Sequence, residues 1–72
     1  MKRKIVDSSL LASIGYDKKE KILEVEFTHG GIYQYMDVPA EEYKALMSAD
    51  SHGQYFIANI RNDFDYVLLS KR

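Results

Sequence analysis

A chain of 72 residues with no cysteine has room for one domain, which its apolar core must stabilise without disulfides. Its net charge of −1 at pH 7 excludes the strongly basic character of many nucleic-acid-binding proteins. No stretch reaches the roughly 18 apolar residues of a membrane-spanning helix, and Asp7 interrupts the apolar run that a signal peptide would need. We therefore expect a cytoplasmic protein with no membrane contact.

The first half of the chain has the two-residue periodicity of strands. Residues 10 to 16 alternate, with one face made of Leu10, Ala12, Ile14 and Tyr16. Residues 22 to 27 alternate more clearly, with an apolar face made of Leu23, Val25 and Phe27. A third strand is expected from Ile32 to Met36, so this half predicts a three-stranded antiparallel meander.

The loop between the second and third of these strands decides where Tyr33 and Tyr35 point. A two-residue loop would place both tyrosines opposite Glu24 and Glu26, because a one-residue slip exchanges the faces of a strand. A three-residue loop of residues 28 to 30, with Gly30 in the left-handed conformation, would instead pair Tyr33 with Val25 and Tyr35 with Leu23. We favour the longer loop, because it gathers the large apolar side chains on one face.

Two short helices and a final strand are expected in the second half. Pro39 suits the first turn of a helix, and Ser51 with Gln54 forms a capping box that starts a second helix from about His52 to Arg61. That helix is expected to present to the core Phe56, Ile57 and Ile60. The end of the chain alternates through Phe64, Tyr66 and Leu68. The prediction is one α+β domain over residues 1–72, in the order β-β-β-α-α-β, with basic tails at residues 1–6 and 70–72.

Several short motifs along residues 8 to 69 together resemble the KTSC domain family. They are Ile14-Gly15-Tyr16-Asp17, Tyr33-x-Tyr35, Val38-Pro39, Ser51-x-Gly53, Tyr55-Phe56 and Ile60-Arg61. Their order and spacing carry the resemblance rather than any single motif. The family occurs as small bacterial proteins and at the C-terminus of some lysyl-tRNA synthetases. The resemblance therefore implies a role in RNA binding.

Three groups of residues are candidates for nucleic-acid contact. The basic segment Lys2, Arg3 and Lys4 would form one patch with Lys71 and Arg72 if the two ends of the chain meet. Ser51, His52 and Gly53 open a helix whose amide hydrogens could bind phosphate, with Arg61 adding charge nearby, although a capping box alone also explains Ser51. Tyr33 and Tyr35 could stack on bases, but we favour a place in the core.

Catalysis and metal binding are not expected. Ser51 and His52 lack an orienting acid, and the polar residues Asn62, Asp63 and Asp65 lack the distal glutamate of a calcium loop. We therefore expect no enzyme activity, cofactor, metal or small-molecule substrate. Two functions stay open: a weak RNA-binding accessory domain, and a protein-interaction module or homodimer that uses an exposed sheet edge or an aromatic patch.

Overall fold

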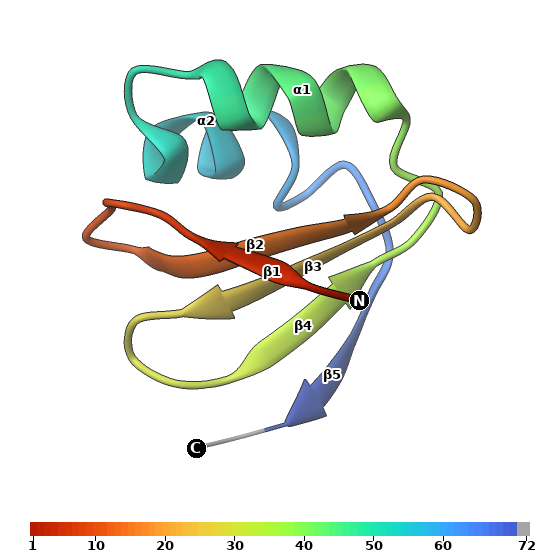
Figure 1. Ribbon diagram of the computed structural model, residues 1–72, viewed down its shortest axis with the longest axis horizontal. Coiled ribbons are helices and arrows are strands. Elements are labelled where there is room, and N and C mark those ends of the chain that lie inside the picture. Colours follow the sequence, from red (N-terminus) through yellow and green to blue (C-terminus); the bar gives the residue numbers. More distant parts are fainter. Residues whose placement is uncertain (71–72) are drawn as a thin grey trace.

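A computed structural model describes residues 1–70 as two layers, an antiparallel five-stranded sheet with two helices packed on one face (Figure 1). In sheet order the strands are β1 (Arg3–Ile5), β2 (Leu11–Asp17), β3 (Ile22–Phe27), β4 (Ile32–Tyr35) and β5 (Tyr66–Ser70). The helices are α1 (Ala40–Ser48) and α2 (His52–Asn59). The α+β class, the antiparallel sheet and the two helices are confirmed. The three-stranded meander is wrong, because four strands precede the helices.

The additional strand is β1, which the sequence analysis assigned to a basic tail. Arg3 pairs with Gly15 and Ile5 pairs with Ser13 in an antiparallel register along β2. A strand of three residues is too short to show a periodicity, so no local pattern could reveal it. Residue Ser70 likewise belongs to β5, and residues 71–72 lie outside the described part of the chain. The predicted tails at 1–6 and 70–72 are therefore wrong over the residues that form strands.

The hairpin between β3 and β4 has the three-residue loop that was favoured. The Phe27 amide donates to the Gly31 carbonyl at 3.0 Å, so residues 28 to 30 form the loop. Gly30 has a φ of 101°, in the left-handed region that glycine tolerates. Leu23 pairs with Tyr35 and Val25 with Tyr33, so both tyrosines share the apolar face of β3.

A bulge in β2 changes the faces predicted for its first residues. The register against β3 shifts between Leu11 and Ser13, because an extra residue there lies outside the regular ladder. Leu11 and Ile14 are consequently both fully buried, although strict alternation placed them on opposite faces. Ser13 and Gly15 pair with Glu26 and Glu24, so they lie on the sheet face away from the helices.

Helix α1 begins at Ala40, so Pro39 stands at its N-cap rather than in its first turn, whereas α2 starts where the sequence predicted. Ser51 Oγ accepts a hydrogen bond from the Gln54 amide at 3.2 Å, which confirms the cap of α2. The helix ends at Asn59 rather than at Arg61. Phe56 and Ile60 are buried, but Ile57 is 47% exposed and was wrongly assigned to the core.

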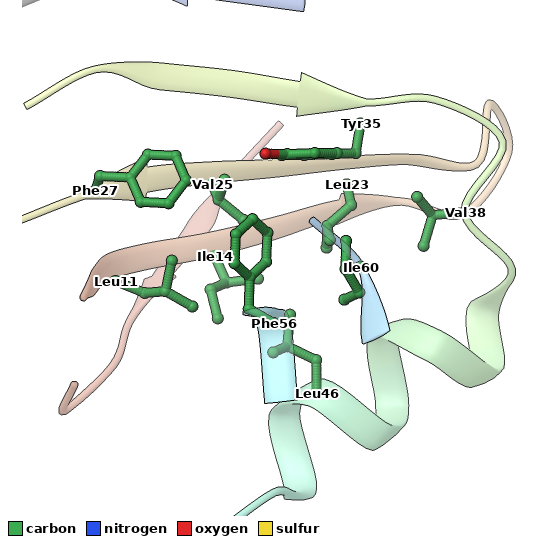
Figure 2. Close-up of a cluster of buried hydrophobic side chains, with 10 residues drawn as sticks. All are labelled: Leu11, Ile14, Leu23, Val25, Phe27, Tyr35, Val38, Leu46, Phe56 and Ile60. Carbon is green, nitrogen blue, oxygen red and sulfur yellow. The ribbon is translucent and has the colours of Figure 1, made fainter. Parts of the chain in front are cut away.

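The core lies between the helices and the central strands. Figure 2 shows its ten buried side chains, with Phe56 from α2 between the sheet residues and Leu46 of α1. The ring of Phe56 contacts those of Phe27 and Tyr35 edge to face, at centroid distances of 5.6 and 5.4 Å. Strand β5 lies at the far edge of the sheet from the helices, and all of its residues are exposed (Figure 1). No helix within residues 1–70 is long and apolar enough to cross a membrane.

Candidate functional site

The structure has a cavity of about 410 Å³ beside the end of α2. It lies between β3, β4, β5 and the end of α2. We call it the aromatic cavity, and its lining residues are Leu10, Phe27, His29, Tyr33, Tyr35, Phe56, Arg61, Asn62 and Tyr66. This volume falls within the range of roughly 300 to 1,000 Å³ that is typical of small-ligand sites.

Strand register places the aromatic rings of the cavity side by side. Tyr66 of β5 pairs with Tyr35 of β4, so both project on the helix side of the sheet. The Tyr66 ring lies 5.4 Å from that of Tyr35 and 5.5 Å from that of Tyr33. Tyr33 also meets Phe27 edge to face at 5.3 Å. The result is a connected aromatic surface, of which Tyr66 is the exposed member.

Tyr35 and Tyr33 differ in burial. Tyr35 is 4% exposed and belongs to the core, whereas Tyr33 is partly buried against it. Burial, with the neighbouring phenols of Tyr66 and Tyr33, raises the pKa of Tyr35 to about 12, and Arg61 acts in the opposite direction. The Tyr35 hydroxyl is therefore protonated at neutral pH and can both donate and accept a hydrogen bond.

Arg61 stands at the cavity because of how α2 ends. The amides of Ile60 and Arg61 both donate to the Phe56 carbonyl, at 3.0 and 2.9 Å. Ile60 is fully buried, while Arg61 and Asn62 are exposed. Two candidates that the sequence treated separately, the tyrosine motif and Arg61, therefore line one cavity. The sequence analysis missed Tyr66 and Asn62 there, because only the pairing of β5 with β4 brings that segment to Tyr33 and Tyr35.

The residues at the start of α2 form a different site with unfavourable charge for an anion. Ser51, His52 and Gly53 line a second cavity of about 370 Å³, together with Asp7 and Asp50. Arg61 does not line it, so the predicted combination is not assembled. The two carboxylates oppose phosphate binding.

Each of the three residues at this helix start also has a structural role. Ser51 caps the helix, and His52 Nδ1 lies 2.8 Å from the Leu46 carbonyl oxygen. A Cβ added at Gly53 would lie 3.2 Å from Leu10 Cβ, so glycine allows close packing there. The capping explanation therefore accounts for this segment better than a phosphate site does.

The basic segment at the start of the chain is divided by its strand. Arg3 Nη1 forms an ion pair with Glu24, and Arg3 Nε donates to Ser13 Oγ at 2.8 Å. Lys2 and Lys4 are exposed. Strands β1 and β5 are the opposite edges of the sheet, so the start of the chain and Ser70 do not lie side by side. The other half of the predicted patch, Lys71 and Arg72, lies outside the described residues.

Comparison with known proteins gives consistent matches. Residues 7–64 match the KTSC domain family. An uncharacterised protein of Stutzerimonas stutzeri is 52% identical over 56 residues, which cover 78% of this chain and 79% of that protein. A lysine–tRNA ligase of Nostoc punctiforme is 33% identical over 64 residues, which cover 89% of this chain but 11% of that enzyme. The crystal structure of a KTSC domain protein from Yersinia pestis superposes on this structure with a TM-score of 0.94 and is 38% identical in sequence. The match covers 96% of this chain and 97% of the Yersinia chain.

Proposed function

The chain belongs to the KTSC domain family, and we propose that it is a non-catalytic cytoplasmic domain that binds single-stranded RNA weakly through the aromatic cavity. The observation that carries the proposal is the meeting of aromatic rings with a cation in one hollow. Single strands bind to proteins by stacking bases on aromatic side chains while basic groups follow the phosphates. Tyr33 and Tyr66 offer ring surface, and Arg61 offers the charge.

The relationship to lysine–tRNA ligases supports RNA as the ligand. Those enzymes carry a region similar to 89% of this chain, and their name states that they act on tRNA. A domain of this size within a tRNA-binding enzyme would be useful as an additional RNA contact. The same activity in a free-standing chain would be that of an accessory domain.

The charges of the described residues make the expected binding weak. Arg61 is the one arginine or lysine among the residues that line the aromatic cavity, and Arg3 is already paired with Glu24. Each phosphate neutralised on a single strand contributes about −0.7 to the slope of log affinity against log salt. We therefore expect a slope between about −0.7 and −1.4, corresponding to one or two phosphate contacts.

The test is a fluorescence anisotropy titration of a labelled single-stranded RNA at several salt concentrations. Arg61→Ala should weaken binding and flatten the salt slope. Lys44→Ala is the matched control, because Lys44 is an exposed cation on α1 that does not line the cavity. The proposal fails if the wild-type chain does not bind at low salt, or if the two variants lose affinity equally.

One observation favours a second candidate, self-association through β5. This edge strand carries four large apolar side chains that are each about half exposed: Tyr66, Val67, Leu68 and Leu69. An uncharged apolar edge is a template for pairing with another strand, and a second β5 in antiparallel orientation would join two sheets. Val67 pairs with Gln34, on the sheet face away from the cavity, so Val67→Lys should prevent pairing without touching the aromatic rings. Sedimentation at increasing protein concentration would reveal the dimer, and a monomer at every concentration would exclude it.

A further inference from the structure

The hydroxyl of Tyr35 is a polar group at the aromatic cavity that the fold does not use. The residue is 96% buried, since its exposure is 4%, yet the hydroxyl makes no hydrogen bond to any of residues 1–70. The hydroxyls of Tyr16 and Tyr55, by contrast, are used within the fold. The Tyr16 hydroxyl donates to the Val38 carbonyl, and the Tyr55 hydroxyl donates to Glu42 Oε1 at 2.9 Å. The Tyr35 oxygen itself is not fully enclosed, so the hydroxyl is free to bond whatever occupies the space beside it.

The position of this hydroxyl explains how a ligand would reach it. Figure 2 shows the Tyr35 ring lying along the sheet above Phe56, with its oxygen at the end that faces Phe27. Phe27, Phe56 and Tyr35 all line the aromatic cavity. No side-chain oxygen or nitrogen among the described residues is both fully enclosed and unpaired, so the Tyr35 oxygen is accessible from this space. It is therefore a hydrogen-bonding group inside an aromatic enclosure.

We infer that the aromatic cavity is a site for one unpaired nucleotide, whose base enters among the rings and hydrogen-bonds to the Tyr35 hydroxyl while its phosphate contacts Arg61. This inference rests on the proposed RNA binding and specifies the unit that is bound. The rings of Tyr33 and Tyr66 match the flat faces of a base. The hydroxyl of Tyr35 and the amide of Asn62 match the polar edge of a base, which carries both donors and acceptors.

The combination of rings, hydroxyl and cation favours a single-stranded nucleotide over an apolar ligand, a free phosphate or a base in a duplex. A purely apolar ligand would leave the Tyr35 hydroxyl unpaired and would gain nothing from Arg61. A free inorganic phosphate would use Arg61 alone and would leave the rings bare. A base within a duplex cannot reach the cavity, because its faces are covered by stacking and its edge by pairing. A single-stranded nucleotide uses the rings, the hydroxyl and the cation together.

The experiment measures binding of the four ribonucleoside 5′-monophosphates to the full chain by NMR titration, and their competition with labelled single-stranded RNA. At least one monophosphate should shift the signals of residues lining the cavity and displace the RNA. The corresponding nucleoside should bind more weakly, and Arg61→Ala should abolish that difference. If RNA binds but no monophosphate binds or competes, the nucleotide site is wrong while the proposed function stands. If RNA itself does not bind, the proposed function fails as well.

Tyr35→Phe tests the hydroxyl, with Tyr16→Phe as the matched control. Loss of one hydrogen bond to the base should weaken monophosphate binding by roughly 2- to 13-fold in Tyr35→Phe. The unfolding midpoint of this variant should be equal to or above that of the wild type, because the hydroxyl has no protein partner to lose. Tyr16→Phe should show the reverse pattern, with a lower midpoint and unchanged nucleotide affinity, since its hydroxyl bonds the Val38 carbonyl. Equal nucleotide affinity of Tyr35→Phe and wild type would overturn the role of the hydroxyl.

Discussion

Replacing Arg3 should destabilise the protein, because its side chain neutralises a buried carboxylate on the sheet face away from the helices. Glu24 is 6% exposed and receives two side-chain partners, the Arg3 guanidinium and Gln34 Nε2, the latter at 2.9 Å. The Arg3→Met substitution keeps the length of the side chain and removes its charge. Glu24 would then retain one neutral hydrogen bond in a site that excludes most water.

The burial of the two partners sets the size of the effect. Exposed ion pairs contribute about 0 to 1 kcal/mol, whereas removing one partner of a fully buried pair costs about 3 to 5 kcal/mol. Here the Arg3 side chain is 27% exposed and that of Glu24 is 8% exposed, which lies between these limits. We therefore expect Arg3→Met to lower the free energy of unfolding by about 1.5 to 3 kcal/mol, the range for a hydrogen bond to a charged group.

Urea unfolding of a double-mutant cycle with Glu24→Gln is the measurement. The double variant should recover part of the loss, because no buried charge is then left unpaired, and the coupling energy should exceed about 1 kcal/mol. The RNA affinity of Arg3→Met should match that of the wild type. Additive effects, or a loss below about 0.5 kcal/mol, would show that the pair behaves as an ordinary surface contact.

Three further outcomes follow from the structure. Gly15→Ala should lower the free energy of unfolding in urea by about 1 to 3 kcal/mol, because the new Cβ would lie 2.7 Å from the backbone oxygen of Lys2 and must displace β1. Wild-type stability of this variant would contradict the packing. Ser51→Ala should cost about 0.5 to 2 kcal/mol by the same assay, through loss of the cap on α2, whereas Ser51→Asp should not. Burial raises the pKa of Tyr35 to about 12, above the usual value of about 10 for a tyrosine, so folding favours the protonated phenol. Its contribution is complete below pH 10 and is lost as the pH rises toward 12, so alkaline unfolding should be less steep in Tyr35→Phe than in the wild type.

The register of the central hairpin could be predicted because chemistry allowed one satisfactory choice. A two-residue loop would have placed Tyr33 and Tyr35 opposite Glu24 and Glu26 and separated them from the other large apolar groups. The glycine at position 30 supplied a residue that tolerates a φ of 101°. Local pattern and loop chemistry agreed, and the observed pairs are those of the longer loop.

The strand β1 and the bulge in β2 could not be predicted, because neither has a local signal. Arg3 is identified as a strand residue only by what lies across from it. It reaches Glu24 over Gly15, the residue on β2 with which it pairs and which has no side chain to obstruct it. The bulge between Leu11 and Ser13 lets two residues that are not related by alternation both face the core. Both features depend on contacts between strands, which a single sequence does not encode as a periodicity.

The candidate site was only half predictable for the same reason. The tyrosine motif and Arg61 were visible as residue types, but their neighbourhood depends on β5 returning to pair with β4 after both helices. That pairing brings Tyr66 to Tyr35. The predicted site at Ser51 and His52 had the stronger local signal. That signal came from helix capping, and the cap already uses the Ser51 hydroxyl.

The ring and the hydroxyl of Tyr35 have different roles in this fold. Packing explains the ring of Tyr35, because it meets Phe56 and Tyr66 and pairs across the sheet with Leu23. Packing does not require its hydroxyl, because phenylalanine would fill the same place, and the unpaired oxygen is not fully enclosed. The proposed nucleotide site gives this hydroxyl a role that the core does not. The same reasoning does not apply to Tyr16, whose hydroxyl is used within the fold.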